Sequence, residues 1–139
     1  MYHTLISAAV ALFSGSLAFA QLPGPAVTVS YDTKYDVSTT PVSTLACASS
    51  LSNFTTFGAL PEYPYIAGSD NVTDSSKTDC GHCYTLEYAG NFAQIQVVDS
   101  AAEGFVLSHE AYEWLTMNYT SDPSVTAYIL NGPEACDFS

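Results

Sequence analysis

Residues 80–99, CGHCYTLEYAGNFAQIQVVD, decide the fold class of this 139-residue chain. They predict a β-hairpin with a first arm at Cys83–Tyr88, a short turn at Ala89-Gly90 and a second arm at Phe92–Val98. In the second arm apolar and polar side chains alternate, which is the period of a strand with one buried face. Asp99 follows directly, where a strand delivers its side chain to the edge of a barrel.

Further strands follow from alternation and composition on both sides of the hairpin. Residues 27–31 alternate apolar with polar side chains, and Val125–Leu130 is a last strand. Asn53–Gly58 holds strand-forming residues that end on a glycine. Thr44–Leu51 fits either a helical turn or a buried strand, because its period does not decide. Five or six short strands predict a small, mostly β barrel.

Loops and one helix account for most of the remaining chain. Val37–Thr44 is rich in Ser, Thr and Pro and is predicted as a loop, and the prolines of Leu60–Tyr65 forbid regular ladder pairing. A helix is predicted over Ser108–Met117, with its first residue as N-cap and Glu110 in the positive first turn. The helical spacing of Trp114 predicts a core position.

The N-terminal segment and the charge balance restrict the function classes. Met1–Ala20 is apolar and closes on Ala-Phe-Ala, which is typical of a cleaved secretory signal, so we expect a secreted protein that begins at Gln21. The chain has fourteen Asp and Glu residues in total but only two Lys and Arg residues, for a net charge of −12. With only Lys34 and Lys77 as cations, a nucleic-acid footprint or an anionic-membrane patch is excluded. After the signal no apolar run is long enough to span a bilayer.

Four cysteines in a small secreted chain predict two disulfides, with three possible pairings. The spacing of Cys80 and Cys83 also fits a redox or zinc half-site. A structural zinc needs a second closely spaced pair of ligands, however, and Cys47 and Cys136 lie far apart in the sequence. We therefore interpret all four cysteines as structural.

Three residues are candidates for binding a saccharide. Tyr31 and Asp32 offer a flat ring and a hydrogen-bond acceptor at the end of the first strand, which is what a pyranose needs from a groove. Asp99 offers a second carboxylate for charge-assisted hydrogen bonds. As a set, the nine tyrosines after the signal, together with phenylalanines, would also supply an apolar patch for self-association.

The chain resembles the cerato-platanin family of small secreted fungal proteins. The resemblance covers nearly the whole mature chain and rests on these motifs in this order: Val29-Ser-Tyr-Asp32, Phe54-Thr-Thr-Phe-Gly58, Leu60-Pro61, Tyr63-Pro64, Cys80-Gly-His-Cys-Tyr-Thr-Leu86 and Val97-Val-Asp99. It implies a six-stranded double-psi β-barrel with one or two short helices and a single domain over residues 21–139. It also implies disulfides Cys47–Cys80 and Cys83–Cys136.

The resemblance further implies function. Members of the family bind chitin or N-acetylglucosamine oligomers without an accepted enzyme activity, self-assemble at interfaces, and act on plants as elicitors or virulence factors. The expected location is the medium or the fungal cell wall. Cellulose and a plant receptor are further expected partners.

Two alternatives to polysaccharide binding stay open. A glycan-cleaving enzyme on the same barrel would use Asp99 and a second carboxylate at a fixed separation. The candidates for that second carboxylate are Asp32, Asp36, Asp79 and Glu103. Alternatively, a surface loop is read by a receptor and the sugar groove is incidental.

The sequence predicts no metal and no cofactor. His82 and His109 are expected at the surface or at caps, because neither has ligand-type neighbours at the required spacing. Asn71 and Asn118 head glycosylation sequons, whereas the sequon at Asn53 lies in a motif expected to be buried.

Overall fold

The computed structural model describes residues 24–118 and 120–137. The predicted signal at Met1–Ala20 and the predicted mature start at Gln21 lie outside the described residues. Within the described part of the chain, no helix has the length and apolar character needed to cross a membrane.

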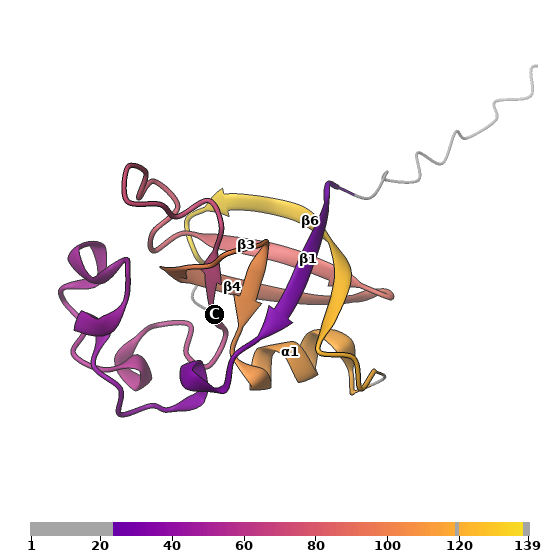
Figure 1. The fold of residues 1–139 in the computed structure, drawn as a ribbon, viewed down its shortest axis with the longest axis horizontal. Coiled ribbons are helices and arrows are strands. Elements are labelled where there is room, and N and C mark those ends of the chain that lie inside the picture. The colour runs from indigo at the N-terminus through magenta and orange to yellow at the C-terminus, as the bar shows by residue number, and fades with distance from the viewer. Residues whose placement is uncertain (1–23, 119, 138–139) are drawn as a thin grey trace, which may run out of the picture.

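Six strands close a barrel (Figure 1), and they follow one another around it in the order β1-β5-β2-β4-β3-β6. Their bounds are β1 Ala26–Tyr31, β2 Ile66–Ser69, β3 Cys83–Tyr88, β4 Asn91–Ser100, β5 Phe105–Leu107 and β6 Ser124–Glu134. The β1–β5 and β2–β4 pairs are parallel and the others antiparallel. The structure thus confirms the six-stranded, mostly β barrel.

The β3–β4 hairpin confirms the prediction made from residues 80–99. Tyr88 pairs with Asn91, and the two residues between them, Ala89 and Gly90, have φ of 49° and 83°. Two consecutive positive φ angles are characteristic of the tight hairpin turn that matches the twist of the strands. The Gly90 N–H also donates to the Glu87 carboxylate over 2.6 Å.

Two strands escape prediction because they are too short to show a period. β2 has four residues that are all buried, and β5 has three. Both lie between strands distant in sequence, so their β structure depends on tertiary pairing. The sequence also predicted a strand at Asn53–Gly58, and the structure contradicts that prediction. That segment makes one isolated bridge, Pro41 to Thr56, and then a 3₁₀ turn at Phe57–Ala59.

The β1–β2 connection, residues 32–65, forms a lobe beside the barrel (Figure 1). It consists of loops and four 3₁₀ turns, η1 Thr33–Asp36, η2 Val42–Thr44, η3 Ala48–Leu51 and η4 Phe57–Ala59. Thr44–Leu51, which the sequence left undecided, therefore contains a helical turn. Buried side chains from the lobe join the barrel core in one continuous cluster.

Helix α1, His109–Thr116, confirms the predicted helix and its cap. The Ser108 hydroxyl accepts a hydrogen bond from the Ala111 N–H over 3.1 Å. The core prediction for Trp114 is wrong, because that side chain is 52% exposed. The buried face of α1 consists of Ala111, Tyr112, Leu115 and Thr116. At 100° per residue, Trp114 points well away from the centre of that face.

The disulfides are Cys47–Cys80 and Cys83–Cys136, which confirms the pairing that the resemblance implied. The bonded cysteines are 33 and 53 positions apart in the sequence. Loops of this length are expected to gain roughly 3 to 4 kcal/mol per bridge from the reduced entropy of the unfolded chain. The first bridge ties the lobe to the segment before β3, and the second ties the C-terminal tail to β3.

Gly104 permits the close approach that starts β5 beside β1. Its φ is +56°, and a Cβ placed there would lie 2.0 Å from the Thr28 carbonyl oxygen. We expect Gly104→Ala to lower the free energy of unfolding by about 3 kcal/mol, from the positive φ and the backbone clash together. Urea denaturation would measure the loss.

Gly90→Ala is the matched control for this substitution. Gly90 also has a positive φ, +83°, but a Cβ there meets nothing within 4 Å. The control should therefore lose only the conformational term, about 1 kcal/mol. Equal losses in the two variants would show that the contact with Thr28 does not constrain the barrel.

Candidate functional site

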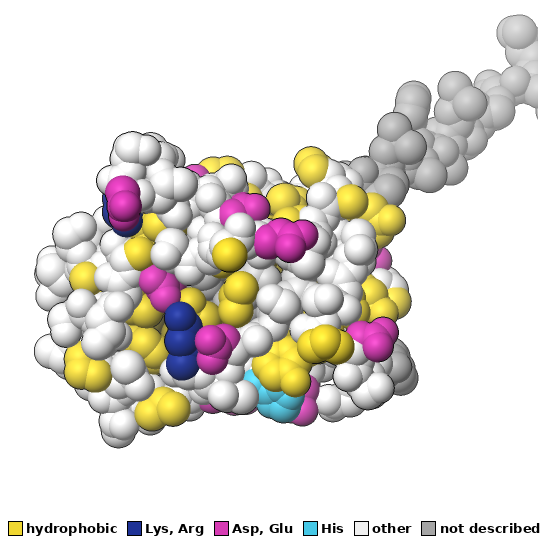
Figure 2. Space-filling model, viewed as in Figure 1, with side chains coloured by type: hydrophobic (Ala, Val, Ile, Leu, Met, Phe, Trp, Pro, Cys, Tyr) yellow, Lys and Arg dark blue, Asp and Glu magenta, His cyan; other side chains and the backbone are white. Residues whose placement is uncertain are grey.

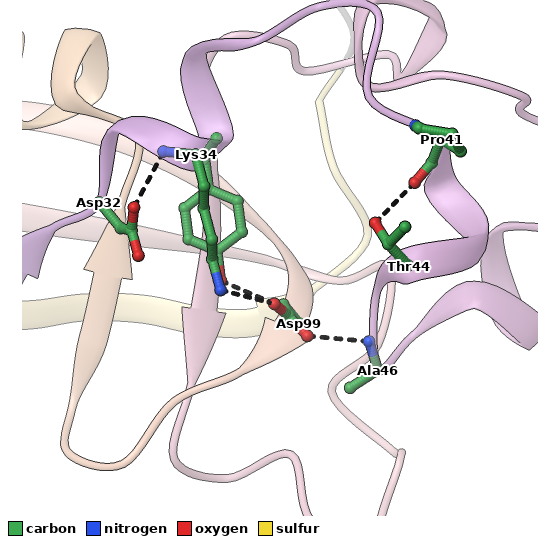
Figure 3. A network of polar contacts seen from close by, with 7 residues as sticks. Asp32, Lys34, Pro41, Thr44, Ala46 and Asp99 are labelled. Atoms are coloured by element: carbon green, nitrogen blue, oxygen red, sulfur yellow. Dashed lines mark hydrogen bonds and ion pairs between the residues drawn. The ribbon is translucent and has the colours of Figure 1, made fainter.

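Asp99 lies at the end of β4, where the lobe meets the barrel (Figure 3). Its Oδ1 accepts a hydrogen bond from the Ala46 N–H over 2.8 Å, and its Oδ2 accepts one from the Tyr35 hydroxyl over 2.8 Å. The Lys34 ammonium lies 3.4 Å from the same Oδ2. The Asp99 side chain is only 13% exposed. This carboxylate therefore holds two separate parts of the lobe against the barrel.

Burial and negative charge keep Tyr35 neutral. Burial is the largest cause that raises the pKa of Tyr35 far above its usual value of about 10, and the charge and hydrogen bond of Asp99 and the charge of Asp32 raise it further. The Tyr35 hydroxyl is thus a permanent donor to Asp99. Lys34 lies 4.7 Å from the centroid of the Tyr35 ring and is 55% exposed, so its ammonium is partly available to a ligand.

A hollow opens beside the Asp99–Lys34 pair. It has a volume of about 290 Å³ and is lined by Lys34, Val37, Thr40, Thr44, Leu45, Phe57 and Asp99. Leu45 and Phe57 are buried core residues that supply apolar walls. On the face shown in Figure 2, hydrophobic side chains are visible in a hollow beside a lysine that has acidic side chains near it. Such a cavity, apolar with a few fixed polar groups at its edge, has the character of a small ligand site.

Asp32 and Tyr31 have different surroundings from Asp99. The Asp32 carboxylate accepts a hydrogen bond from the Lys34 N–H over 2.9 Å and caps η1. The Tyr31 ring is 37% exposed and lies against His109 and Tyr112, with centroid distances of 4.6 and 4.9 Å.

The structure therefore groups Lys34 with Asp99 but places Tyr31 elsewhere. The Tyr31 ring lines a second hollow of about 120 Å³, which it shares with residues of α1 and of the segment before β6. The sequence predicted one groove shared by Tyr31, Asp32 and Asp99, whereas Tyr31 and Asp99 line different hollows. The Asp36 carboxylate anchors η1, because it accepts hydrogen bonds from the His109 and Glu110 N–H groups at the start of α1 over 2.9 and 3.1 Å.

The candidates for a second catalytic carboxylate are dispersed. Asp36 binds the start of α1, Asp79 accepts a hydrogen bond from the Tyr84 hydroxyl over 2.6 Å, and Glu103 accepts one from Thr28 over 3.1 Å. Asp32 is near enough to Asp99 for both charges to act on Tyr35. Both oxygens of Asp99 accept hydrogen bonds within the protein, however, so this carboxylate has a structural task already.

The predicted modification sites are at the surface. Asn71 and Asn118 are exposed, and the Asn71 amide also donates to the Tyr84 hydroxyl over 3.4 Å. The expectation that Asn53 lies in a buried motif is wrong for this residue, because Asn53 is exposed and lies in a turn instead of a strand.

Histidines and cysteines give no metal site among the described residues. His82 is exposed, and His109 lies 3.5 Å from the Glu113 carboxylate. One group of potential ligands brings Glu62 together with Cys83 and Cys136, but those two sulfurs are bonded to each other. A bridged sulfur is not the thiolate that binds zinc.

Sequence reasoning missed several residues around the hollow. Lys34 and Tyr35 follow Asp32 after one intervening residue, Thr33, and a lysine and a tyrosine so close to a candidate acidic residue were the available signal. Nothing in the sequence pointed to the Ala46 N–H, because a backbone donor in a loop does not depend on the side chain. Leu45 and Phe57 were signalled only as apolar residues.

The fold and the hollow define a small, disulfide-linked β-barrel protein with a shallow surface site. The sequence model of the cerato-platanin family matches residues 27–128, and the chain belongs to this family. Members of the family are secreted fungal proteins.

Two curated relatives are similar in sequence. Allergen Asp f 15 of Aspergillus fumigatus is 31% identical over 94 residues, which cover 65% of this chain and 62% of that protein, so the match spans less than two thirds of the relative. The heat-stable 19 kDa antigen of Coccidioides posadasii is 26% identical over 121 residues, which cover 84% of this chain and 83% of the antigen.

Solved structures show the same fold. Cerato-platanin 1 from M. perniciosa is 28% identical with a TM-score of 0.71, and the match covers 81% of this chain and 96% of that one. Cerato-platanin 2 from M. perniciosa is 27% identical with a TM-score of 0.67, with coverage of 74% and 90%. The barrel described above is therefore the barrel of this family.

The raised pKa of Tyr35 predicts a pH dependence of stability. In the unfolded chain tyrosine ionises near pH 10, whereas Tyr35 stays neutral in the fold, so its contribution is complete below about pH 10 and is lost as the pH rises above that. Tyr35→Phe should therefore reduce the loss of unfolding free energy between about pH 10 and 12 by roughly 1.4 kcal/mol per pH unit. Denaturant titrations at several alkaline pH values would measure the slope.

The same variant provides its own reference at neutral pH. There, Tyr35→Phe should cost about 1 to 2 kcal/mol, because the Asp99 carboxylate loses a buried partner. A wild-type slope equal to that of the variant would contradict the assignment of Tyr35 as the ionisable group.

Proposed function

We propose that this secreted protein binds N-acetylglucosamine oligomers and chitin at the Asp99–Lys34 hollow without cleaving them. The observation that carries the proposal is the combination of apolar walls with a fixed ammonium and carboxylate at one edge. A pyranose has an apolar C–H face and a polar rim, so it matches a site of this kind. The hollow is small enough that it accepts about one sugar unit.

Each side chain has a role in this proposal. Leu45 and Phe57 contact the C–H face of the sugar, and Lys34 donates to its hydroxyl or N-acetyl oxygens. Asp99 orients the Lys34 ammonium. It also accepts a hydrogen bond from the sugar at a lone pair that its three protein donors leave free.

Tyr31 and Asp32 extend the site along an oligomer. The Tyr31 ring, next to α1, is a stacking surface for a further sugar, and Asp32 at the start of η1 is an acceptor for its hydroxyls. Both hollows are shallow and exposed to water, so dissociation constants nearer micromolar to millimolar than nanomolar are expected.

Binding without turnover is favoured over hydrolysis. Glycoside hydrolysis needs two carboxyl groups across the scissile bond, one of which gives up a proton. Three of the four candidates for the second group are engaged elsewhere in the fold. Asp99 accepts hydrogen bonds at both oxygens, and no donor role is left for it.

Binding to polysaccharide also accounts for an elicitor-type role. A protein retained on chitin would stay in the fungal cell wall, and binding to cellulose would retain it on a plant surface, where a plant receptor would meet it. One solved relative with the same fold is itself described as the fungal elicitor cerato-platanin. Self-association through exposed aromatic residues would increase retention by multivalency.

Retention on insoluble chitin tests the proposal. Lys34→Ala removes the exposed ammonium and should weaken binding about fivefold, as expected for one partly solvated charge-assisted hydrogen bond. Lys77→Ala is the matched control, because it removes the same charge from a loop outside the hollow. Equal retention of the two variants would remove the Asp99–Lys34 hollow from the site.

A second measurement separates binding from catalysis. Soluble N-acetylglucosamine oligomers should shift backbone NMR signals near Lys34, Leu45 and Asp99, while the same samples release no new reducing ends. An increase in reducing ends that is abolished in Asp99→Asn would establish the enzyme alternative instead.

A further inference from the structure

An exposed aromatic surface that the Asp99–Lys34 hollow does not use lies where α1 meets the start of β4 and the residue before β2. It consists of Trp114, Phe92 and Tyr65, and the first two are 52% and 54% exposed. The Trp114 and Tyr65 rings meet edge to face with their centroids 6.4 Å apart. A large indole that faces water in a small protein is unusual, because such rings contribute most to stability when buried.

The Trp114 indole is fixed in its exposed position. Its Nε1–H donates to the Phe92 carbonyl over 3.2 Å, and the Asn91 side-chain amide donates to the carbonyls of Trp114 and Leu115 at the end of α1. These bonds tie α1 to the start of β4. The ring face is therefore presented to solvent in a defined orientation, which reduces the entropy cost of binding.

Two hollows flank the Trp114–Tyr65 pair, and both rings line both of them. One has a volume of about 360 Å³ and also contains Phe92, Glu62 and Asp137. The other has a volume of about 340 Å³ and also contains Glu110 and Glu113. A ligand that crosses the indole would therefore meet a carboxylate pair on each side.

The charge of this surface selects among ligands. No Lys or Arg lines either hollow, and within the described residues Lys34 lies in the separate hollow at Asp99. Burial, followed by the charge of Asp137, raises the pKa of Glu62. A bound cation would relieve the repulsion between these two groups. Carboxylates around an exposed indole thus favour a cationic ligand, which gains both charge pairing and a cation–π contact.

We infer that the surface formed by Trp114, Phe92 and Tyr65 with its flanking carboxylates is a second saccharide site, specific for protonated amino sugars such as the glucosamine units of deacetylated chitin chains. The indole stacks on the C–H face of one sugar, and the ammonium groups of that sugar and its neighbour lie against the carboxylates. Gln94 lines the first of these hollows and supplies an amide for the hydroxyl groups. The inference goes beyond the proposed function, because the Asp99–Lys34 hollow contains a cation of its own.

The fluorescence of Trp114 tests this inference directly, because it is the only tryptophan in the chain. Glucosamine tetramer, added at about pH 6, should change the emission in a saturable way. The N-acetylglucosamine tetramer should bind at least about tenfold more weakly here, because it lacks the charge. The response to glucosamine tetramer should weaken as salt is raised, as expected for an exposed charge interaction.

Two outcomes of the titration would overturn the inference. Equal affinity for the acetylated tetramer would show that charge does not select the ligand. Equal affinity for spermine, which carries amines but no sugar ring, would show a general cation surface instead of a saccharide site.

Substitutions identify the groups involved. Glu62→Gln and Glu113→Gln should each weaken the binding of glucosamine tetramer about threefold, whereas Asp74→Asn, which removes an exposed charge from the loop before β3, should leave it unchanged. Weakening by Asp74→Asn to the same extent would show that only net charge matters. Trp114→Ala, followed by backbone NMR, should abolish the local response while the shifts near Lys34 with acetylated oligomers remain.

The two proposals fail separately. Loss of the Trp114 response with intact chitin retention would overturn only the amino-sugar site. Loss of the Lys34 effect on chitin retention, with the Trp114 response intact, would overturn only the Asp99–Lys34 hollow.

Discussion

The hydrogen bonds to the Asp99 carboxylate are the constraint on which the rest of the molecule depends. A 34-residue connection between β1 and β2 has no strand of its own and forms a lobe beside the barrel. Asp99 fixes it at two points, the Tyr35 hydroxyl and the Ala46 N–H, and the Cys47–Cys80 bridge fixes it at the residue next to Ala46. These contacts position a lobe whose buried side chains also join the barrel core in one continuous cluster.

The attachment also shapes the hollow that we propose as the sugar site. Lys34 is oriented by the same Asp99 oxygen that holds Tyr35, and the walls of the hollow come from the lobe residues Leu45 and Phe57. Stability and the candidate site are therefore linked through one carboxylate. An aspartate of this kind serves first by organising other groups, and any contact of its own with a ligand is secondary.

The sequence predicted the elements that have a period and missed those that tertiary pairing creates. The hairpin, β1, β6 and α1 could be found from alternation, turn residues and a cap, because each signal is local. β2 and β5 were missed because four and three residues are too few to show a period. The segment at Asn53–Gly58 was assigned wrongly because its β-forming composition is overridden by the burial of Phe57.

The candidate site was predicted in part for a similar reason. Asp99 could be placed at a barrel edge by counting along its strand, and the resemblance gave the correct cysteine pairing. The partners of Asp99 could not be predicted from the sequence, because Ala46 contributes only its backbone N–H and the turn of η1 brings Lys34 close. Trp114 was assigned to the core because helical spacing indicates a face of a helix but not which face is buried.

The Cys83–Cys136 bridge has a consequence for the acidic surface at the end of the chain. Asp137 belongs to no strand or helix, and its neighbour in the sequence is the bridged cysteine that holds it beside Glu62. In a reducing cytosol this tail would be untethered and one of the carboxylates flanking the indole would drift away. Oxidation of this bridge thus does more than stabilise the barrel: it completes the acidic surface that we infer to bind amino sugars, and a chain whose cysteines are still reduced would lack that surface.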